Sequence, residues 1–177
     1  NLLLSADHST EITVCPQFSF TIRSLDRGYP PRMPEPFRSS PRAPVVWTTN
    51  DTALALDPAT GELLWRRPYT TPSTTTSQTP HVYQNDVIEA GRGNGITRFR
   101  VVREGNAWTT ENVWHTDEVS LHLTNGVIVD GVLYGLSHLN SGQYFGLDLD
   151  TGDVLWTSPP RQADNAAIVY AGTTIFS

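Results

Sequence analysis

The chain has 177 residues, of which 38% are hydrophobic, and it carries a formal net charge of −6 at pH 7. This length suits one domain with an ordinary core, and the acidic balance argues against a nucleic-acid binder, which needs a basic face. No apolar run approaches the roughly 18 residues of a membrane span, and the N-terminus shows no recognisable signal peptide. Since a starting Met is also absent, we expect a fragment or a processed product.

The basic and sulfur-containing residues exclude several kinds of site. All 12 basic residues are Arg, which excludes a Schiff-base lysine and a Walker-type phosphate lysine within this chain. Cys15 is the single cysteine, so an internal disulfide and a CxxC zinc or redox site are excluded as well.

Residues 1–43 differ from the rest of the chain because prolines punctuate Arg- and Ser-containing sequence, which prevents regular strand pairing. We expect an irregular leader or a degenerate repeat unit here. A proline-rich ligand for another domain is the alternative. The prolines are Pro30, Pro31, Pro34, Pro36 and Pro41.

From residue 44 the pattern changes to short alternating segments bounded by turn residues, which predicts β-strands. No window shows a convincing helical period, so the sequence predicts an all-β fold. The expected strands are 45–48, 52–56, 62–65, 81–83, 86–90, 96–101, 112–114, 127–129, 132–135, 144–147, 154–156, 167–170 and 174–176.

One 11-residue phrase occurs twice, at 55–65 and at 146–156, with the same residue at six positions. Each copy reads as a hairpin in which a strand ends in Leu-Asp, a turn closes at Thr-Gly, and a second strand ends in Trp. Glycine suits the positive φ of such turns, and aspartate accepts hydrogen bonds from the turn backbone.

The spacing of the repeats predicts the architecture. The phrase glycines, Gly61 and Gly152, lie 91 residues apart, and strand-end tryptophans lie between them at intermediate spacing. The interval therefore corresponds to two units of about 45 residues, of which the middle one has lost the Asp-x-x-Thr-Gly phrase. Four short strands per 40–50 residues is typical of a β-propeller blade. The predicted units are about 44–66, 79–115, 124–157 and the start of another at 165–177.

The phrase resembles the repeat of the pyrroloquinoline-quinone (PQQ) type β-propellers, Ala-x-Asp-x-x-Thr-Gly-x-x-x-Trp, over about residues 40–177. The resemblance implies an incomplete ring of about three to four four-stranded blades, in which each Trp docks against a neighbouring blade. Gly146 replaces the Ala of the second copy, and the register of the middle blade, with Trp108 and Trp114, stays open. The implied turn and docking residues are Asp57, Thr60, Gly61, Trp65, Trp114, Asp148, Thr151, Gly152 and Trp156.

The resemblance also bears on function. A quinoprotein dehydrogenase of this family would be expected to show an adjacent Cys pair, a carboxylate–amide calcium site and an aspartate base, and the lone Cys15 cannot supply the pair. We therefore expect no catalytic residue, no metal ligand and no cofactor in this segment. The expectation is a non-catalytic binding or scaffold module that contacts a protein partner or the remaining blades. Similarity to outer-membrane assembly lipoproteins implies a periplasmic, outer-membrane-associated or secreted location.

Two alternatives remain open at this point. The chain could be a fragment of a dehydrogenase that uses PQQ and calcium to oxidise alcohols or sugars, with its active site in other blades. It could also belong to a surface or adhesion propeller without a small-molecule ligand.

Two smaller groups of residues have alternative interpretations. His115, Asp117, Glu118 and His122 follow a strand-end Trp, where we expect a polar loop, although their side chains could also be metal ligands. Residues 91–95 are glycine-rich and could suggest a phosphate-binding loop. Since no helix is predicted to follow, we expect a flexible hairpin there.

Overall fold

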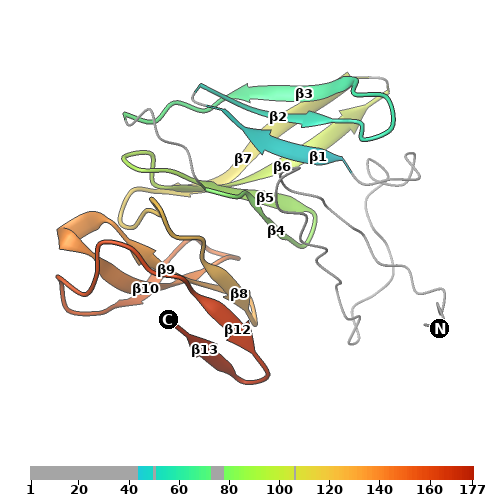
Figure 1. Ribbon diagram of the computed structural model, residues 1–177. Helices are drawn as coiled ribbons and strands as arrows, with labels where there is room; N and C mark the ends of the chain where they lie inside the picture. The colour runs from blue at the N-terminus through green and yellow to red at the C-terminus, as the bar shows by residue number, and fades with distance from the viewer. Residues whose placement is uncertain (1–43, 50, 73–77, 106) are drawn as a thin grey trace.

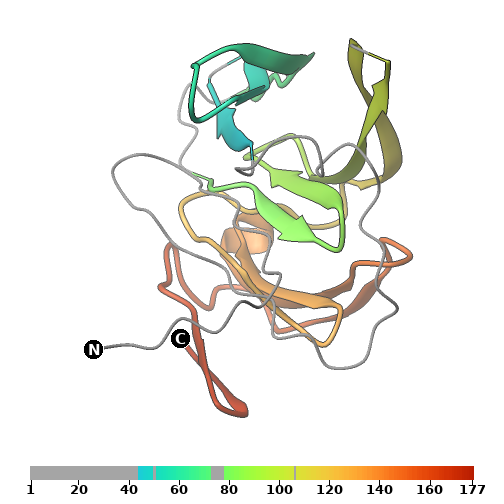
Figure 2. The ribbon, with the colours of Figure 1, turned by 90° about the vertical axis from the view of Figure 1, so that its right-hand side faces the viewer.

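The computed structural model describes residues 44–49, 51–72, 78–105 and 107–177. The expectations for the leader at 1–43 lie outside these residues. The described chain is made of antiparallel strands, with one short 3-10 turn, η2 (Leu139–Ser141). Successive sheets lie face to face in chain order, as Figures 1 and 2 show from two directions.

The strands form three meandering sheets and one hairpin, each built from strands adjacent in sequence. The first sheet contains β1 (Val45–Thr48), β2 (Thr52–Leu56) and β3 (Leu63–Pro68). The second contains β4 (His81–Tyr83), β5 (Asp86–Ala90), β6 (Ile96–Glu104) and β7 (Ala107–Thr116). The third contains β8 (Val127–Val129), β9 (Val132–Ser137), β10 (Gln143–Asp148) and β11 (Val154–Thr157). The hairpin is β12 (Val169–Ala171) with β13 (Thr174–Phe176).

The largest difference from the expected strands is in the second sheet. Here β6 and β7 are longer than expected, because the hairpin that joins them continues to a turn at Gly105. This extension replaces the short Asp-x-x-Thr-Gly turn found in the first and third sheets. It explains why the phrase is missing from the middle unit although its strands are kept.

The structure settles the register of that middle unit. In each sheet one tryptophan of the last strand pairs with a residue of the neighbouring strand, and a register shift follows directly after this pair, which is the signature of a β-bulge. The equivalent tryptophan of the middle sheet is therefore Trp114, and Trp108 lies in the extension. The three pairs are Trp65 with Ala55, Trp114 with Arg98 and Trp156 with Gly146.

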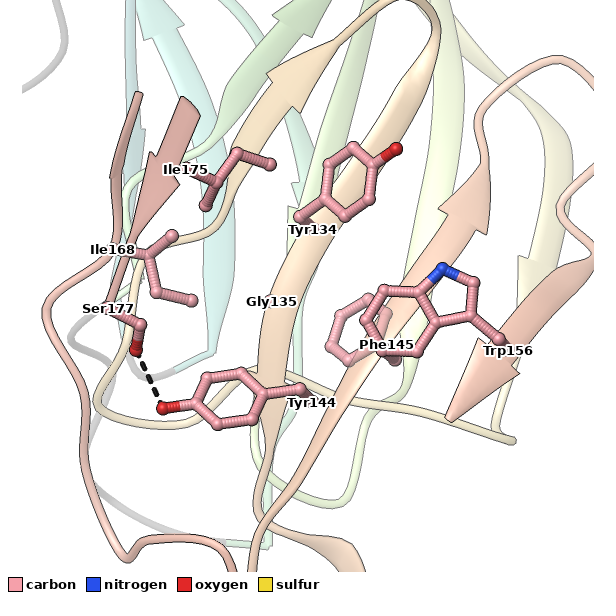
Figure 3. A pocket seen from close by; sticks show the side chains of 8 residues that line it. All are labelled: Tyr134, Gly135, Tyr144, Phe145, Trp156, Ile168, Ile175 and Ser177. Atoms are coloured by element: carbon pink, nitrogen blue, oxygen red, sulfur yellow. Dashed lines mark hydrogen bonds between the residues drawn. The ribbon is translucent and has the colours of Figure 1, made fainter. Parts of the chain in front are cut away.

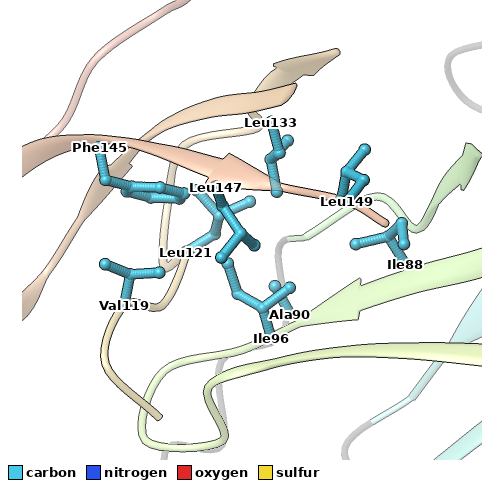
Figure 4. Packing of buried hydrophobic residues seen from close by; sticks show 9 residues of the cluster. All are labelled: Ile88, Ala90, Ile96, Val119, Leu121, Leu133, Phe145, Leu147 and Leu149. Atoms are coloured by element: carbon cyan, nitrogen blue, oxygen red, sulfur yellow. The ribbon is translucent and has the colours of Figure 1, made fainter. Parts of the chain in front are cut away.

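Two hydrophobic cores lie between successive sheets, because alternate residues of each strand face opposite neighbours. The core between the first and second sheets includes Trp65, Tyr69 and Phe99. The core between the second and third sheets is aliphatic around Phe145, as Figure 4 shows, and consists of Ile88, Ala90, Ile96, Val119, Leu121, Leu133, Phe145, Leu147 and Leu149.

Candidate functional site

The polar residues of the repeated phrase are engaged within their own turns. Asp57 Oδ1 accepts hydrogen bonds from the backbone N–H groups of Ala59, at 2.7 Å, and Thr60, at 3.1 Å. The hydroxyl of Thr60 accepts a further bond from the N–H of Glu62 at 3.2 Å. Gly61 closes this turn with φ +73°.

The second copy of the phrase repeats this arrangement. Asp148 Oδ1 accepts from the N–H groups of Asp150, at 2.8 Å, and Thr151, at 3.0 Å. Thr151 Oγ1 in turn accepts from the N–H of Asp153 at 3.2 Å, and Gly152 has φ +84°. Both copies therefore use their side chains to hold a turn in shape.

Two of the equivalent tryptophans contact the sheet that follows their own. Trp65 is 4% exposed and meets Phe99 of β6 edge-on, with ring centroids 5.5 Å apart. Trp114 covers Gly152 in the turn of the third sheet and donates a hydrogen bond from Nε1 to the carbonyl of Leu149 at 3.0 Å. The phrase turn of the third sheet is thus the docking surface for the tryptophan of the second sheet.

The third tryptophan has no such cover. Trp156 is 45% exposed and packs over Gly146 of its own sheet, where a β-carbon would lie 2.5 Å from the indole Nε1. It borders a shallow cavity of about 270 Å³ between the third sheet and the β12–β13 hairpin, shown in Figure 3. The cavity is lined by Tyr134, Gly135, Tyr144, Phe145, Trp156, Ile168, Ile175 and Ser177.

This cavity is a partly filled contact between sheets. Tyr144 and Ser177 close one side through a hydroxyl–hydroxyl bond of 2.6 Å, so the hairpin already packs at one edge. Trp156 occupies the position that Trp114 occupies in the sheet before it. An apolar lining with one hydroxyl pair offers shape and burial to a contacting surface.

A buried ion-pair network joins the second and third sheets. Arg98 is 5% exposed and stands at the repeat position that Ala55 and Gly146 occupy elsewhere. Its Nε bonds Asp86 Oδ2 at 2.7 Å, and its Nη1 donates to the carbonyl of Leu149 at 2.7 Å. That carbonyl also accepts the Trp114 bond, so two side chains of one sheet hold the same turn of the next.

The outer residues of this network are more exposed to solvent than Arg98 and Asp86. Arg100 is 55% exposed and bonds the other side of Asp86, with Nε 3.0 Å from Oδ1. Asp150 Oδ1 accepts from the Tyr83 hydroxyl at 3.1 Å and lies 3.4 Å from Arg98 Nη1. The hydrogen bond to Asp150 contributes to a raised pKa of Tyr83, for which burial is the main cause.

A second buried polar group lies between the first and second sheets. Glu89 on β5 is 3% exposed, and its nearest cation is Arg67, with Nε 3.5 Å from Oε1. Burial raises the pKa of Glu89 to about 7, and Arg67 offsets part of this rise. Nearby, the buried Tyr69 hydroxyl donates to the carbonyl of Ala90, and burial raises the pKa of Tyr69 far above its usual value, with Glu89 adding to the rise.

The structure separates the residues that were considered as metal ligands. His115 lies on β7, not in a loop as expected, and bridges Thr97 Oγ1 at 2.8 Å and Asp117 Oδ1 at 3.0 Å. His122 lies apart from this pair, beside His138. Among the described residues, no three His, Cys, Asp or Glu side chains gather in an arrangement that could hold a metal ion.

The glycine-rich segment is a tight connection between β5 and β6. The N–H of Asn94 donates to the carbonyl of Gly91 at 2.9 Å, and β6 begins immediately afterwards at Ile96. The segment therefore lacks the helix N-terminus that a phosphate-binding loop requires.

The residues that sequence analysis missed are those whose partners come from another sheet. Arg98 appeared only as one member of an alternating strand, and Glu89 only as the end of another. One signal was present for Arg98, because it interrupts a repeat position that is otherwise Ala or Gly. Its buried partners could not be read from a single strand.

A comparison with protein-family models matches residues 34–166 to the family described as outer membrane protein assembly factor BamB. The chain belongs to this family. Its fold is accordingly a β-propeller of the PQQ-repeat type, as the repeated phrase predicted, and the sheets described above are its blades. A search of the curated proteins gave no match.

Two solved structures resemble the chain. Quinohemoprotein alcohol dehydrogenase ADHIIG from Pseudomonas putida HK5 is 17% identical with a TM-score of 0.48, over 65% of this chain and 20% of that one. BamB from Moraxella catarrhalis is 22% identical with a TM-score of 0.45, over 64% of this chain and 37% of that one. The chain thus spans well under two thirds of either protein. Within the described residues there is no helix long and apolar enough to span a membrane.

Proposed function

We propose that this chain is part of a non-catalytic PQQ-like propeller that acts as a binding or scaffold module outside the cytoplasm. The observation that carries the proposal is the open Trp156 face of the third blade. Trp156 stands at the same repeat position as Trp114, which packs on the phrase turn of the next blade. The face around Trp156 is only partly covered by β12 and β13. Such a face binds a complementary protein surface through burial of apolar area.

The occupant that fits this face is a β-turn with glycine against the indole, supplied by a further blade or by a protein partner. The reason is the Trp114 contact, in which Gly152 admits the ring and the carbonyl of Leu149 accepts the indole N–H. On the hairpin, Ile175 lines the same cavity as Trp156, and its exposed cross-strand partner Tyr170 extends this apolar surface.

Other features support a structural use of the repeat. The phrase carboxylates of Asp57 and Asp148 are already bonded to backbone amides of their own turns. We propose that this segment binds no cofactor. Under the alternative, in which the chain is a fragment of an alcohol or sugar dehydrogenase, the cofactors would be PQQ and calcium. Family membership supports a location in the periplasm or at the outer membrane.

The first experiment uses the chain itself. Its first blade presents a phrase turn that the described residues leave uncovered: apart from the glycine's chain neighbours, none of their atoms lies within 4 Å of a β-carbon placed on Gly61. We therefore expect the 177-residue chain to self-associate, the Trp156 face of one copy binding the Gly61 turn of another. Sedimentation velocity should show concentration-dependent oligomers that Trp156→Ser abolishes. Val113→Ser, an apolar-to-polar control at an exposed position of β7 in the second blade, should leave them intact.

The second experiment distinguishes a scaffold module from a fragment of a dehydrogenase. Titration of the chain, and of the longest expressible protein that contains it, with PQQ and calcium should give no saturable binding by absorbance or calorimetry. Stoichiometric PQQ binding, or dye-linked oxidation of alcohols or sugars, would overturn the proposal in favour of the dehydrogenase.

A further inference from the structure

Among the described residues, the first blade has three strands, whereas the second and third have four. The blades can be aligned on the pairs that Trp65, Trp114 and Trp156 make with the neighbouring strand. On this alignment β1 corresponds to β5 and β9, each of which pairs on its other side with an innermost strand, β4 or β8. Within the described part of the chain β1 pairs with β2 alone, so one edge of β1 is open.

The β12–β13 hairpin holds the complementary part of a blade. Its two strands are joined by two residues, like β4–β5 and β8–β9, so β12 corresponds to an innermost strand and β13 to the strand beside it. No described strand pairs with the other edge of β13. The described hairpin therefore has an innermost strand without the two outer strands, whereas the first blade has its outer strands without the innermost one.

The strands β1 and β13 carry similar side chains at corresponding positions. By register, Val45 of β1 corresponds to Leu133 of β9 and to Ile175 of β13. Leu133 is buried against the preceding blade, and Ile175 lines the cavity beside Trp156, also toward the preceding blade (Figure 3). Since Val46 packs in the core with the second blade, Val45 points to the opposite face of its sheet. A branched apolar side chain thus faces Trp156 from either strand.

The strand β13 is weakly held. It pairs with β12 over three residues, and all three of its own residues are exposed. An isolated two-stranded hairpin is marginally stable in water. The strand β1, in contrast, already carries β2 and β3 on its other side, so pairing with β12 would complete a four-stranded sheet like those of the second and third blades.

We propose that two copies of this chain associate by strand exchange, in which β1 of one copy replaces β13 of the other and pairs with β12. The inference rests on the proposed binding of the Gly61 turn to Trp156. In the third blade, β10 leads into the phrase turn and lies directly beside β9. The Gly61 turn follows β2, which lies beside β1 in the same way, so this turn reaches Trp156 when β1 stands in the position of β13.

The test locks the β12–β13 hairpin reversibly. Val169 and Phe176 lie opposite each other, so the double variant Val169→Cys with Phe176→Cys can form a disulfide across the hairpin. Cys15→Ser in the same protein removes the native thiol. The oxidised protein should be monomeric in sedimentation velocity at concentrations where its reduced form, the matched control, makes oligomers.

Hydrogen exchange followed by mass spectrometry reads the exchange directly on the parent chain. On association, residues 174–176 should lose protection because β13 is released. Residues 45–48 should gain protection, and residues 169–171 should keep theirs in the new pair. Oligomers that persist in the oxidised variant, or residues 174–176 that become better protected, would overturn strand exchange and leave the proposed Trp156 contact standing. A parent chain that stays monomeric would overturn both.

Discussion

The indole of Trp114 lies against Gly152 so closely that a β-carbon on this glycine would fall 2.8 Å from Cδ2 of the ring. The two residues belong to successive blades, and each is a member of the repeated pattern. The tryptophan of one unit and the glycine of the next are therefore two halves of a single contact. Gly152 provides the positive φ that its turn requires, and the absence of a side chain leaves the space that the indole of Trp114 fills.

The glycine contact can be tested with a matched pair. Gly152→Ala and Gly61→Ala place the same methyl group at φ +84° and φ +73°, so both incur about 1 kcal/mol of backbone strain. Only at Gly152 does the methyl collide with an indole, which adds about 1–3 kcal/mol. Urea denaturation should show the larger loss for Gly152→Ala, and equal losses would contradict the docking role of Trp114.

We expect the buried Trp65 to contribute more to the free energy of unfolding than the exposed Trp156. Trp65→Ala removes a buried ring packed on Phe99 and should lower the free energy of unfolding by about 3–5 kcal/mol. Trp156→Ala removes a ring that is 45% exposed, and its cost should be about 1 kcal/mol. Denaturant midpoints measured at low protein concentration, where self-association is suppressed, would decide. A large loss for Trp156 alone would show that its face is covered.

The two arginines that bind Asp86 offer a further comparison. Arg98→Met removes the buried partner and should destabilise the chain by about 3–5 kcal/mol, since the Leu149 carbonyl loses a donor and Asp86 loses its closest charge. Arg100→Met removes a partner that is 55% exposed and should cost below about 1 kcal/mol. Thermal melts at neutral pH measure both, and a similar drop in Tm for the two variants would be inconsistent with this network.

Glu89 makes stability depend on pH. Its pKa in the folded chain is about 7, above its ordinary value of 4.5, so folding favours the protonated carboxyl. The stability from this group is fully present below pH 4.5 and is lost as the pH rises through 7. Glu89→Gln removes the penalty on the charged form and should stabilise the chain at pH 8 by about 1–3 kcal/mol, with little effect at pH 5.

The comparison must be made between variants at the same pH. Burial lowers the pKa of His81 to about 4, so its contribution runs the other way and is lost as the pH falls from 6.5 through 4. Glu62→Gln, the same substitution at an exposed position in the first phrase turn, is the matched control for the loss of a carboxylate. A profile of Glu89→Gln parallel to that of the parent chain would show that Glu89 does not titrate as described.

Much of the architecture could be predicted from the order of residues because its determinants are local. Alternation located the strands, and the Asp-x-x-Thr-Gly phrase predicted a turn whose side chains bond backbone atoms two or three residues away. The spacing of Gly61 and Gly152 then predicted repeated blades. The middle blade was harder, since its hairpin extends beyond the bulge at Arg98 and moves the turn away from its tryptophan.

What only the tertiary structure decided depends on which faces of the blades meet. Trp65, Trp114 and Trp156 occupy the same repeat position, yet the first two are covered by the next blade and the third is open. No local pattern distinguishes them. Likewise, the approach of His122 to His138 and the burial of Arg98 and Glu89 are contacts between distant segments. The repeat specifies each blade, and the packing of one blade on the next determines which of its residues remain free to bind.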